Sequence, residues 1–251
     1  MSMESIERFI GLLKESPSDA VFNPWWQVDK QNDIGPNAPA IRRKQLGAYL
    51  RQRLGKAKLA LIGEALGYRG GHFSGIPMTS ERILLGKNKQ FRLKPKDFFS
   101  DINPRRTSKP EKCPRGFSEP TATIVWGTLL RLGRKPEQFV LWNALPWHSF
   151  DPRRGLLSNR MPKKSERAAG LTVLRAFLEL FPCDQVVALG KIAATQLEQL
   201  NVNAHCIRHP ASGGAKLFRQ QIGRIVCKSL QSSRPSRQHV IESWRDREGA
   251  A

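Results

Sequence analysis

Residues 57–75 read AKLALIGEALGYRGGHFSG. The run 57–62 has the composition of a short buried strand, and Gly63 opens a segment that is dense in glycine. Such a segment lets the backbone approach a ligand closely and exposes N–H groups. A phosphate-cradling loop of a nucleotide enzyme is one interpretation, although the segment matches neither GxxxxGK[ST] nor GxGxxG. We therefore expect a ligand-binding loop after this strand.

Further apolar runs extend the same pattern along the chain. We expect strands over 138–143, 185–189 and 203–207, and helices over 4–15, 40–54, 121–132, 164–180, 191–200 and 215–230. Strands that alternate with helices indicate an α/β fold, here a three-layer sandwich with a central, mainly parallel, four-stranded sheet. Ligands bind such sheets outside the carboxyl ends of the strands. The loops that start at Gly63, Asn143, Leu189 and Arg208 should therefore form one pocket.

The charge of the chain indicates a polyanionic partner. The 251 residues carry a formal net charge of +21, which favours nucleic acid. Residues 87–116 hold ten lysines or arginines against three acids and four prolines, so we expect a basic, loop-rich excursion that faces DNA. We expect one domain over residues 1–230 and a polar, flexible tail over 231–251.

Several features exclude other classes of protein. No apolar run approaches the ~20 residues that span a bilayer, and residues 1–7 lack the pattern of a signal peptide. We expect a cytoplasmic, nucleoid-associated monomer that does not bind membranes. The cysteines at positions 113, 183, 206 and 227 include no close pair. The sequence therefore predicts no metal, no iron–sulfur cluster and no other cofactor.

Two further strand ends carry polar residues. Asn143 follows an apolar run, and its amide offers both a donor and an acceptor, although a strand-end asparagine can also simply bond to nearby backbone. His209 precedes a proline at the end of another expected strand. Ser212 and two glycines then lead into a helix, whose N-terminus favours a phosphate.

In this order and placement, the segments resemble the uracil-DNA glycosylase superfamily. GEALG at 63–67 resembles the GEAPG form of the first motif, and HPAS at 209–212 resembles the second motif. LSNRMP at 157–162 resembles the NRxP stretch of several branches, and VALGK at 187–191 resembles a strand-to-helix step of the superfamily. The resemblance runs from about residue 57 to 230.

The resemblance implies a monofunctional glycosylase that flips uracil out of DNA, hydrolyses its glycosidic bond and leaves an abasic site. Phe73 would stack on the base, and Asn143 would read its O4 and N3–H. His209 would donate to O2, and a water near Glu64 and the Ala65 backbone would attack the sugar. Residues that contact the DNA backbone would be Ser212, Gly213, Gly214, Lys216, Arg105, Arg106 and Arg160.

Some positions depart from the best-known branch of the superfamily. Ala65 replaces an Asp, so Glu64 is a candidate for water activation. Gly67 replaces a Tyr that excludes thymine, a task that falls here to Tyr68 or His72. Gly213 replaces a Leu that wedges into the duplex, for which Leu217 or Phe218 is the candidate.

Two alternatives follow from these departures. One is a glycosylase for hypoxanthine or xanthine, because the Asn143 amide can pair with an oxo-purine and Gly67 leaves room. The other is a weakly active or non-catalytic binder of abasic or damaged DNA.

Overall fold

The computed structural model describes residues 3–18, 20–91 and 93–232. Its central sheet has the order β3-β2-β5-β6, with all neighbours parallel. The strands are β2 (Leu59–Ala65), β3 (Phe139–Leu145), β5 (Gln185–Leu189) and β6 (His205–Ile207). The predicted four-stranded α/β fold is confirmed. The apolar runs of β2 and β3 are buried because helices cover both faces of the sheet.

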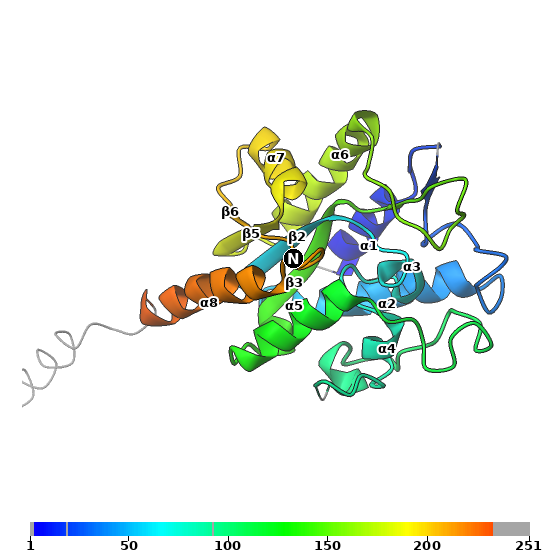
Figure 1. Ribbon diagram of the computed structural model, residues 1–251, viewed down its shortest axis with the longest axis horizontal. Coiled ribbons are helices and arrows are strands. Elements are labelled where there is room, and N and C mark those ends of the chain that lie inside the picture. Colours follow the sequence, from blue (N-terminus) through cyan, green and yellow to red (C-terminus); the bar gives the residue numbers. More distant parts are fainter. Residues whose placement is uncertain (1–2, 19, 92, 233–251) are drawn as a thin grey trace, which may run out of the picture.

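The helices lie on the two faces of the sheet (Figure 1). Figure 1 shows α6 (Lys164–Leu180) and α7 (Lys191–Gln199) on one side, and α5 (Pro120–Arg131) and α8 (Ala215–Ser232) on the other. Helix α1 (Met3–Leu12) packs on α2 (Ala38–Arg53) and α6. Within the described ranges no helix is both long and apolar enough to cross a bilayer.

Aromatic side chains join these layers. Trp142 of β3 stacks on Phe177 of α6 with ring centroids 4.9 Å apart, and Phe9 of α1 meets the same indole edge-on at 5.1 Å. Such pairs add to the large apolar area that aromatic side chains bury. They place the core directly beside the strand that carries Asn143.

The expected elements are all present, with their ends shifted by a few residues. The structure adds elements that are too short to show a periodicity in the sequence. These are α3 (Gly71–Ser74), α4 (Glu81–Leu84), two 3₁₀ turns (Pro95–Asp97 and Pro136–Gln138), and the antiparallel pair β1 (Val21–Phe22) and β4 (His148–Ser149). Helix α8 extends to Ser232, beyond the predicted start of the tail at 231, and residues 233–251 lie outside the described residues.

The basic segment 87–116 is folded against the N-terminal part of the chain. Asp33 and Ser108 form an antiparallel bridge, and the Ile34 N–H donates to the Thr107 carbonyl at 2.7 Å. Glu81 accepts from the backbone N–H groups of Thr107 and Ser108 at 2.7 and 3.0 Å. The excursion that the sequence predicts is therefore anchored at its centre.

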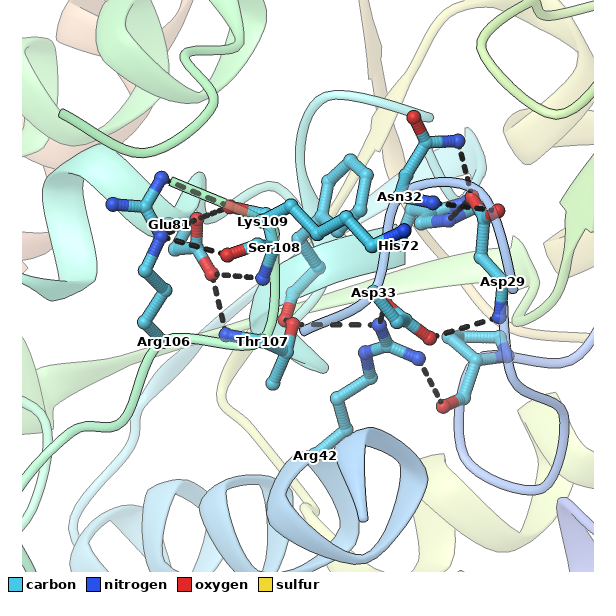
Figure 2. Close-up of polar contacts among 12 residues, drawn as sticks. Asp29, Asn32, Asp33, Arg42, His72, Glu81, Arg106, Thr107, Ser108 and Lys109 are labelled. Carbon is cyan, nitrogen blue, oxygen red and sulfur yellow. Dashed lines mark hydrogen bonds and ion pairs between the residues drawn. The ribbon is translucent and has the colours of Figure 1, made fainter. Parts of the chain in front are cut away.

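Arg42 of α2 is the link between these segments, as Figure 2 shows. Its fully buried guanidinium pairs with Asp33 and donates to the Pro24 carbonyl at 3.0 Å and to Thr107 Oγ1 at 3.3 Å. A buried charge is tolerated only when it is paired and hydrogen-bonded. Arg42 therefore fixes α2, the N-terminal segment and the basic excursion to one another.

A chain of buried side chains runs from the N-terminal segment to the loop after β4. Asp29 Oδ2 lies 3.1 Å from His72 Nε2, and the Nδ1 atoms of His72 and His148 are 3.1 Å apart. His148 Nε2 lies 2.7 Å from the Ser158 carbonyl oxygen. Because both terminal groups accept, three hydrogen bonds here need three protons, one more than two neutral imidazoles carry. Burial lowers the pKa of His72 to about 4, although its hydrogen bond to Asp29 opposes this shift, and burial lowers the pKa of His148 to about 3. Both imidazoles are therefore neutral at pH 7, and one of the three contacts lacks a proton.

The buried pair predicts a large effect of Asp33 on stability. Asp33→Ala leaves the Arg42 guanidinium buried without its counter-ion, so we expect a loss of about 3–5 kcal/mol in the free energy of unfolding. Urea denaturation at pH 7 measures it. The control is Asp101→Ala, which removes an exposed partner of Arg51 and should cost at most about 1 kcal/mol. Equal, small losses in both variants would contradict this role of Arg42.

Candidate active site

A cavity of about 370 Å³ lies at the carboxyl ends of the central strands. Its walls come from the segment after β2, the end of β3 and the turn after β6, together with the loop after β4 and the start of α5. The lining residues are Gly63, Glu64, Ala65, Leu66, Gly67, Met78, Glu119, Thr121, Asn143, Ser149, Asn159, Arg160, Met161, His209 and Ala211. Three of the four loops that the sequence predicts to converge, those that start at Gly63, Asn143 and Arg208, therefore meet around one cavity, whereas the loop at Leu189 does not contribute to its lining.

Asn143 is held at the floor of this cavity by the register of the sheet. It lies beside Gly63 of β2, and a Cβ at Gly63 would collide with Asn143 Oδ1. The side chain is buried, and neither Nδ2 nor Oδ1 has a hydrogen-bond partner among the described residues. Leaving such groups unpaired costs about 1–3 kcal/mol each. The amide can therefore bind a ligand that offers one acceptor and one donor.

Glu64 and Ala65 occupy the end of β2, which continues three residues beyond the strand predicted over 57–62. The Glu64 carboxyl is partly buried in the cavity wall. Burial raises the pKa of this carboxyl above its ordinary value, although the positive charge of Arg167 opposes the shift. Glu64 is therefore a carboxyl group that can orient or deprotonate a water in the cavity.

His209 is presented by a tight turn. The Ala211 N–H donates to His209 Nδ1 at 3.1 Å, so the neutral imidazole carries its proton on Nε2. Burial, helped by the positive charge of Arg208, lowers the His209 pKa. A Cβ at Gly214 would collide with the His209 carbonyl oxygen, so only glycine fits at that point of the turn. The turn supplies a neutral N–H donor.

Phe73 is not in the cavity. It lies in α3, is fully buried, and stacks on Phe117 with ring centroids 4.3 Å apart. Met78, at a positive φ of 47°, lines the cavity beside Gly63 in its place. Phe73 was expected to stack on the base because its side chain is aromatic. Nothing in the sequence marks Met78 as a residue of the cavity.

Two of the predicted DNA-binding arginines are engaged by the protein itself. Arg160 donates to both carboxylate oxygens of Glu166, at 2.9 and 2.5 Å, and to the Phe150 carbonyl at 3.0 Å. Arg106 donates to the carbonyl of Ser108 at 2.7 Å and to that of Pro114 at 2.9 Å. Both guanidiniums anchor loops, in contrast to the phosphate contacts that we expected for them.

The other expected DNA contacts lie at the surface. Arg105 and Lys216 are exposed, and Ser212 and Gly213 follow the His209 turn, both at positive φ. Ser212 lines a second cavity of about 390 Å³, which shares Glu119, Thr121, Asn159 and Ala211 with the first and also contains Tyr68.

The structure distinguishes between the two candidates for the wedge and between the two candidates for thymine exclusion. Phe218 is buried in the core, whereas Leu217 of α8 is 52% exposed. His72 is buried outside the cavity, and Tyr68 lies in the neighbouring cavity. Met161, which is 69% exposed at the cavity edge, is a further apolar candidate that sequence reasoning missed.

Glu119 and Thr121 were also missed because they precede or open α5, a helix that carries no motif. Burial raises the pKa of the Glu119 carboxyl to about 7. The cavity therefore contains a second carboxyl group besides Glu64, and its protonation changes near neutral pH.

Comparisons with known proteins bear on the family and the fold of the chain. The model of the uracil DNA glycosylase superfamily matches residues 53–245. Among solved structures, the wild-type SMUG2 of Pedobacter heparinus is similar in fold, with a TM-score of 0.57 at 14% identity over 91% of this chain and 99% of that chain. A search of curated protein sequences finds no match. Because the superfamily model covers most of the chain, including every strand of the central sheet, the chain belongs to the uracil-DNA glycosylase superfamily and is a DNA glycosylase.

Proposed function

We propose that the protein excises uracil from DNA by hydrolysing the N-glycosidic bond, which leaves an abasic site. The observation that carries this proposal is the buried, unpaired amide of Asn143. It faces a cavity that also contains a neutral histidine and a carboxyl group. A base reaches such a cavity only after it has left the helical stack.

Recognition of uracil rests on the two polar groups of Asn143. Its Nδ2 donates to O4 of uracil, and its Oδ1 accepts from N3–H. Cytosine presents a donor and an acceptor in the reverse order, so it would leave both buried groups unpaired unless the amide rotated. A site built on such hydrogen bonds rejects the wrong partner strongly, because its own polar groups then lose theirs. Met78 supplies an apolar contact to the base.

Cleavage leaves negative charge on the uracil, and His209 is placed to stabilise it. The Nε2–H of the neutral imidazole donates to O2, while Nδ1 is held by the Ala211 N–H. A donor that is already aimed at the developing charge needs no reorganisation during the reaction. His209 therefore acts by electrostatic stabilisation and need not transfer its proton.

Glu64 serves the sugar side of the reaction. The sugar develops positive charge as the bond breaks, and a carboxylate near it both stabilises that charge and orients a water for attack. Ala65 has no carboxylate to share this task. None of the lysines in the described part of the chain lines the cavity, so we propose hydrolysis without a Schiff base.

DNA is held chiefly by charge. The net charge of +21 gives the chain a strong attraction for the phosphate backbone. The exposed Arg105 and Lys216, and the turn at Ser212 and Gly213 before α8, are the proposed phosphate contacts. This binding carries no base specificity, which comes from the cavity. We also propose that the protein acts as a cytoplasmic monomer without a cofactor.

Excision from a panel of oligonucleotides tests the proposal directly. Duplexes with one uracil, hypoxanthine, xanthine or mispaired thymine are incubated with excess protein and cleaved with alkali. We expect strand cleavage at uracil. Excision of purine lesions alone would refute the uracil assignment, and tight binding of abasic DNA without any excision would support a non-catalytic binder.

Removal of the His209 imidazole should slow the chemical step. We expect His209→Ala to reduce the single-turnover rate of uracil excision by about 10²–10³-fold, as for other donors to a developing oxyanion. His205→Ala is the control, because His205 is an exposed histidine on β6 of the same sheet. A rate that stays within twofold of the wild type in His209→Ala would remove His209 from the mechanism.

Loss of the Asn143 amide should weaken recognition. Asn143→Ala removes both hydrogen bonds to the base edge, and we expect excision of uracil to fall by about 10–100-fold. Asn203→Ala, at an exposed position before β6, is the matched control. Unchanged selectivity between uracil and cytosine in Asn143→Ala would exclude Asn143 as the reader of the base.

A further inference from the structure

The Glu119 carboxyl occupies the space that two glycines leave open. A Cβ at Gly67 would collide with its Oε1, and a Cβ at Gly70 would collide with its Oε2. Glu119 immediately precedes α5, yet its side chain does not cap that helix. The carboxyl thus lies against the segment after β2 and forms part of the cavity wall.

One oxygen of the Glu119 carboxyl lacks, among the described residues, the partner that a buried polar atom usually has. Its Oε2 is buried and has no hydrogen-bond partner in the part of the chain that the structure describes. Burial is the cause that raises its pKa to about 7. A buried polar group of this kind is costly unless a ligand completes it. The Glu119 carboxyl can therefore form a hydrogen bond to a ligand in the cavity.

Other titratable and charged groups around Glu119 come from every neighbouring segment. Glu64, His209 and Arg160 line the same cavity, and Arg160 is paired with Glu166. Tyr68 and Arg69 line the second cavity, where the Arg69 guanidinium lies 5.2 Å from the Tyr68 ring centroid. Burial is the cause of the raised Glu119 pKa, and no charged group in the described part of the chain contributes to that shift.

The order of atoms around the base decides what Glu119 can contact. With O2 of uracil at His209, and N3–H and O4 at Asn143, the remaining free edge consists of C5–H and C6–H. An oxo-purine that offers O6 and N1–H to Asn143 places N7 at the corresponding edge. N7 is a hydrogen-bond acceptor. Glu119 lines the same cavity as Asn143 and His209, and a carboxyl group at this remaining edge meets an acceptor only in the purine.

We propose that Glu119 is a specificity-determining residue, whose acid form donates a hydrogen bond to N7 of a deaminated purine and whose carboxylate form excludes that base but not uracil. This inference rests on the proposed function and extends it to a second class of base. Uracil is tolerated by both forms because C5–H is a weak donor to a carboxylate. The carboxylate and the N7 lone pair, in contrast, repel each other.

The direction of the pH effect follows from the raised pKa. Below about pH 7 the acid form predominates and can donate. Above about pH 7 the carboxylate form predominates. The ratio of hypoxanthine excision to uracil excision should therefore fall about tenfold for each pH unit. The ratio cancels pH effects that both bases share, such as the titration of Glu64.

Single-turnover excision of hypoxanthine and uracil between pH 5.5 and 9 tests the inference with the full chain. We expect the ratio to fall above pH 7 in the wild type and to stay flat in Glu119→Gln, whose amide donates at every pH. Glu111→Gln, at an exposed position of the basic excursion, is the control and should titrate like the wild type. A ratio that does not depend on pH in the wild type would overturn the inference without any variant.

A binding measurement separates this inference from the proposed function. Duplexes with 2′-fluoro-deoxyinosine or 2′-fluoro-deoxyuridine resist cleavage and report the affinity for each base. If uracil is not excised but the affinity ratio falls above pH 7 and is flat in Glu119→Gln, the proposed function fails and the role of Glu119 stands. If uracil is excised but the ratio of the two affinities depends neither on pH nor on the Glu119→Gln substitution, only the proposed role of Glu119 is wrong.

Discussion

The parallel register of β2 and β3 places Gly63 beside Asn143, and the site depends on this constraint. Because glycine has no side chain, the Asn143 amide can lie over β2 at the floor of the cavity. There it is buried without a hydrogen-bond partner among residues 3–18, 20–91 and 93–232, at a cost in stability that packing elsewhere in the fold must offset. Aromatic packing of Trp142, the neighbouring residue, contributes to that stability. The fold thus keeps an unsatisfied polar group where a base edge can complete it.

Arginines that pair with buried carboxylates hold the loop after β4 and the basic excursion in place. Arg160 holds the loop after β4 through Glu166, and Arg42 holds the basic excursion through Asp33. Arginine suits this task because its planar guanidinium bonds several acceptors at once. The strongly basic composition therefore serves two purposes: some arginines build the walls of the site, and the exposed remainder attracts DNA. A count of positive charges alone does not separate the two.

Regular elements and strand-end polar residues were predictable from the sequence. The strands and long helices match their expected positions because their apolar runs and periodicities are long enough to read. Asn143, His209 and Glu64 were found because they end or follow strands, and parallel strands bring their carboxyl ends together. The same reasoning could not place Phe73, because the short helix α3 turns its ring into the core. Met78 and Glu119 reach the cavity only through tertiary folding, and their residue types gave no signal.

We propose above all that the flipped base completes the hydrogen bonds of the buried Asn143 amide. The most direct measurement is the NMR signal of the Asn143 side-chain NH₂, assigned by its loss in Asn143→Ala. It is followed as a duplex with uncleavable 2′-fluoro-deoxyuridine is added. We expect a downfield shift of one amide proton and slower exchange with water, because that proton gains a hydrogen bond to O4 of uracil. A signal that saturating DNA leaves unchanged would contradict this proposal.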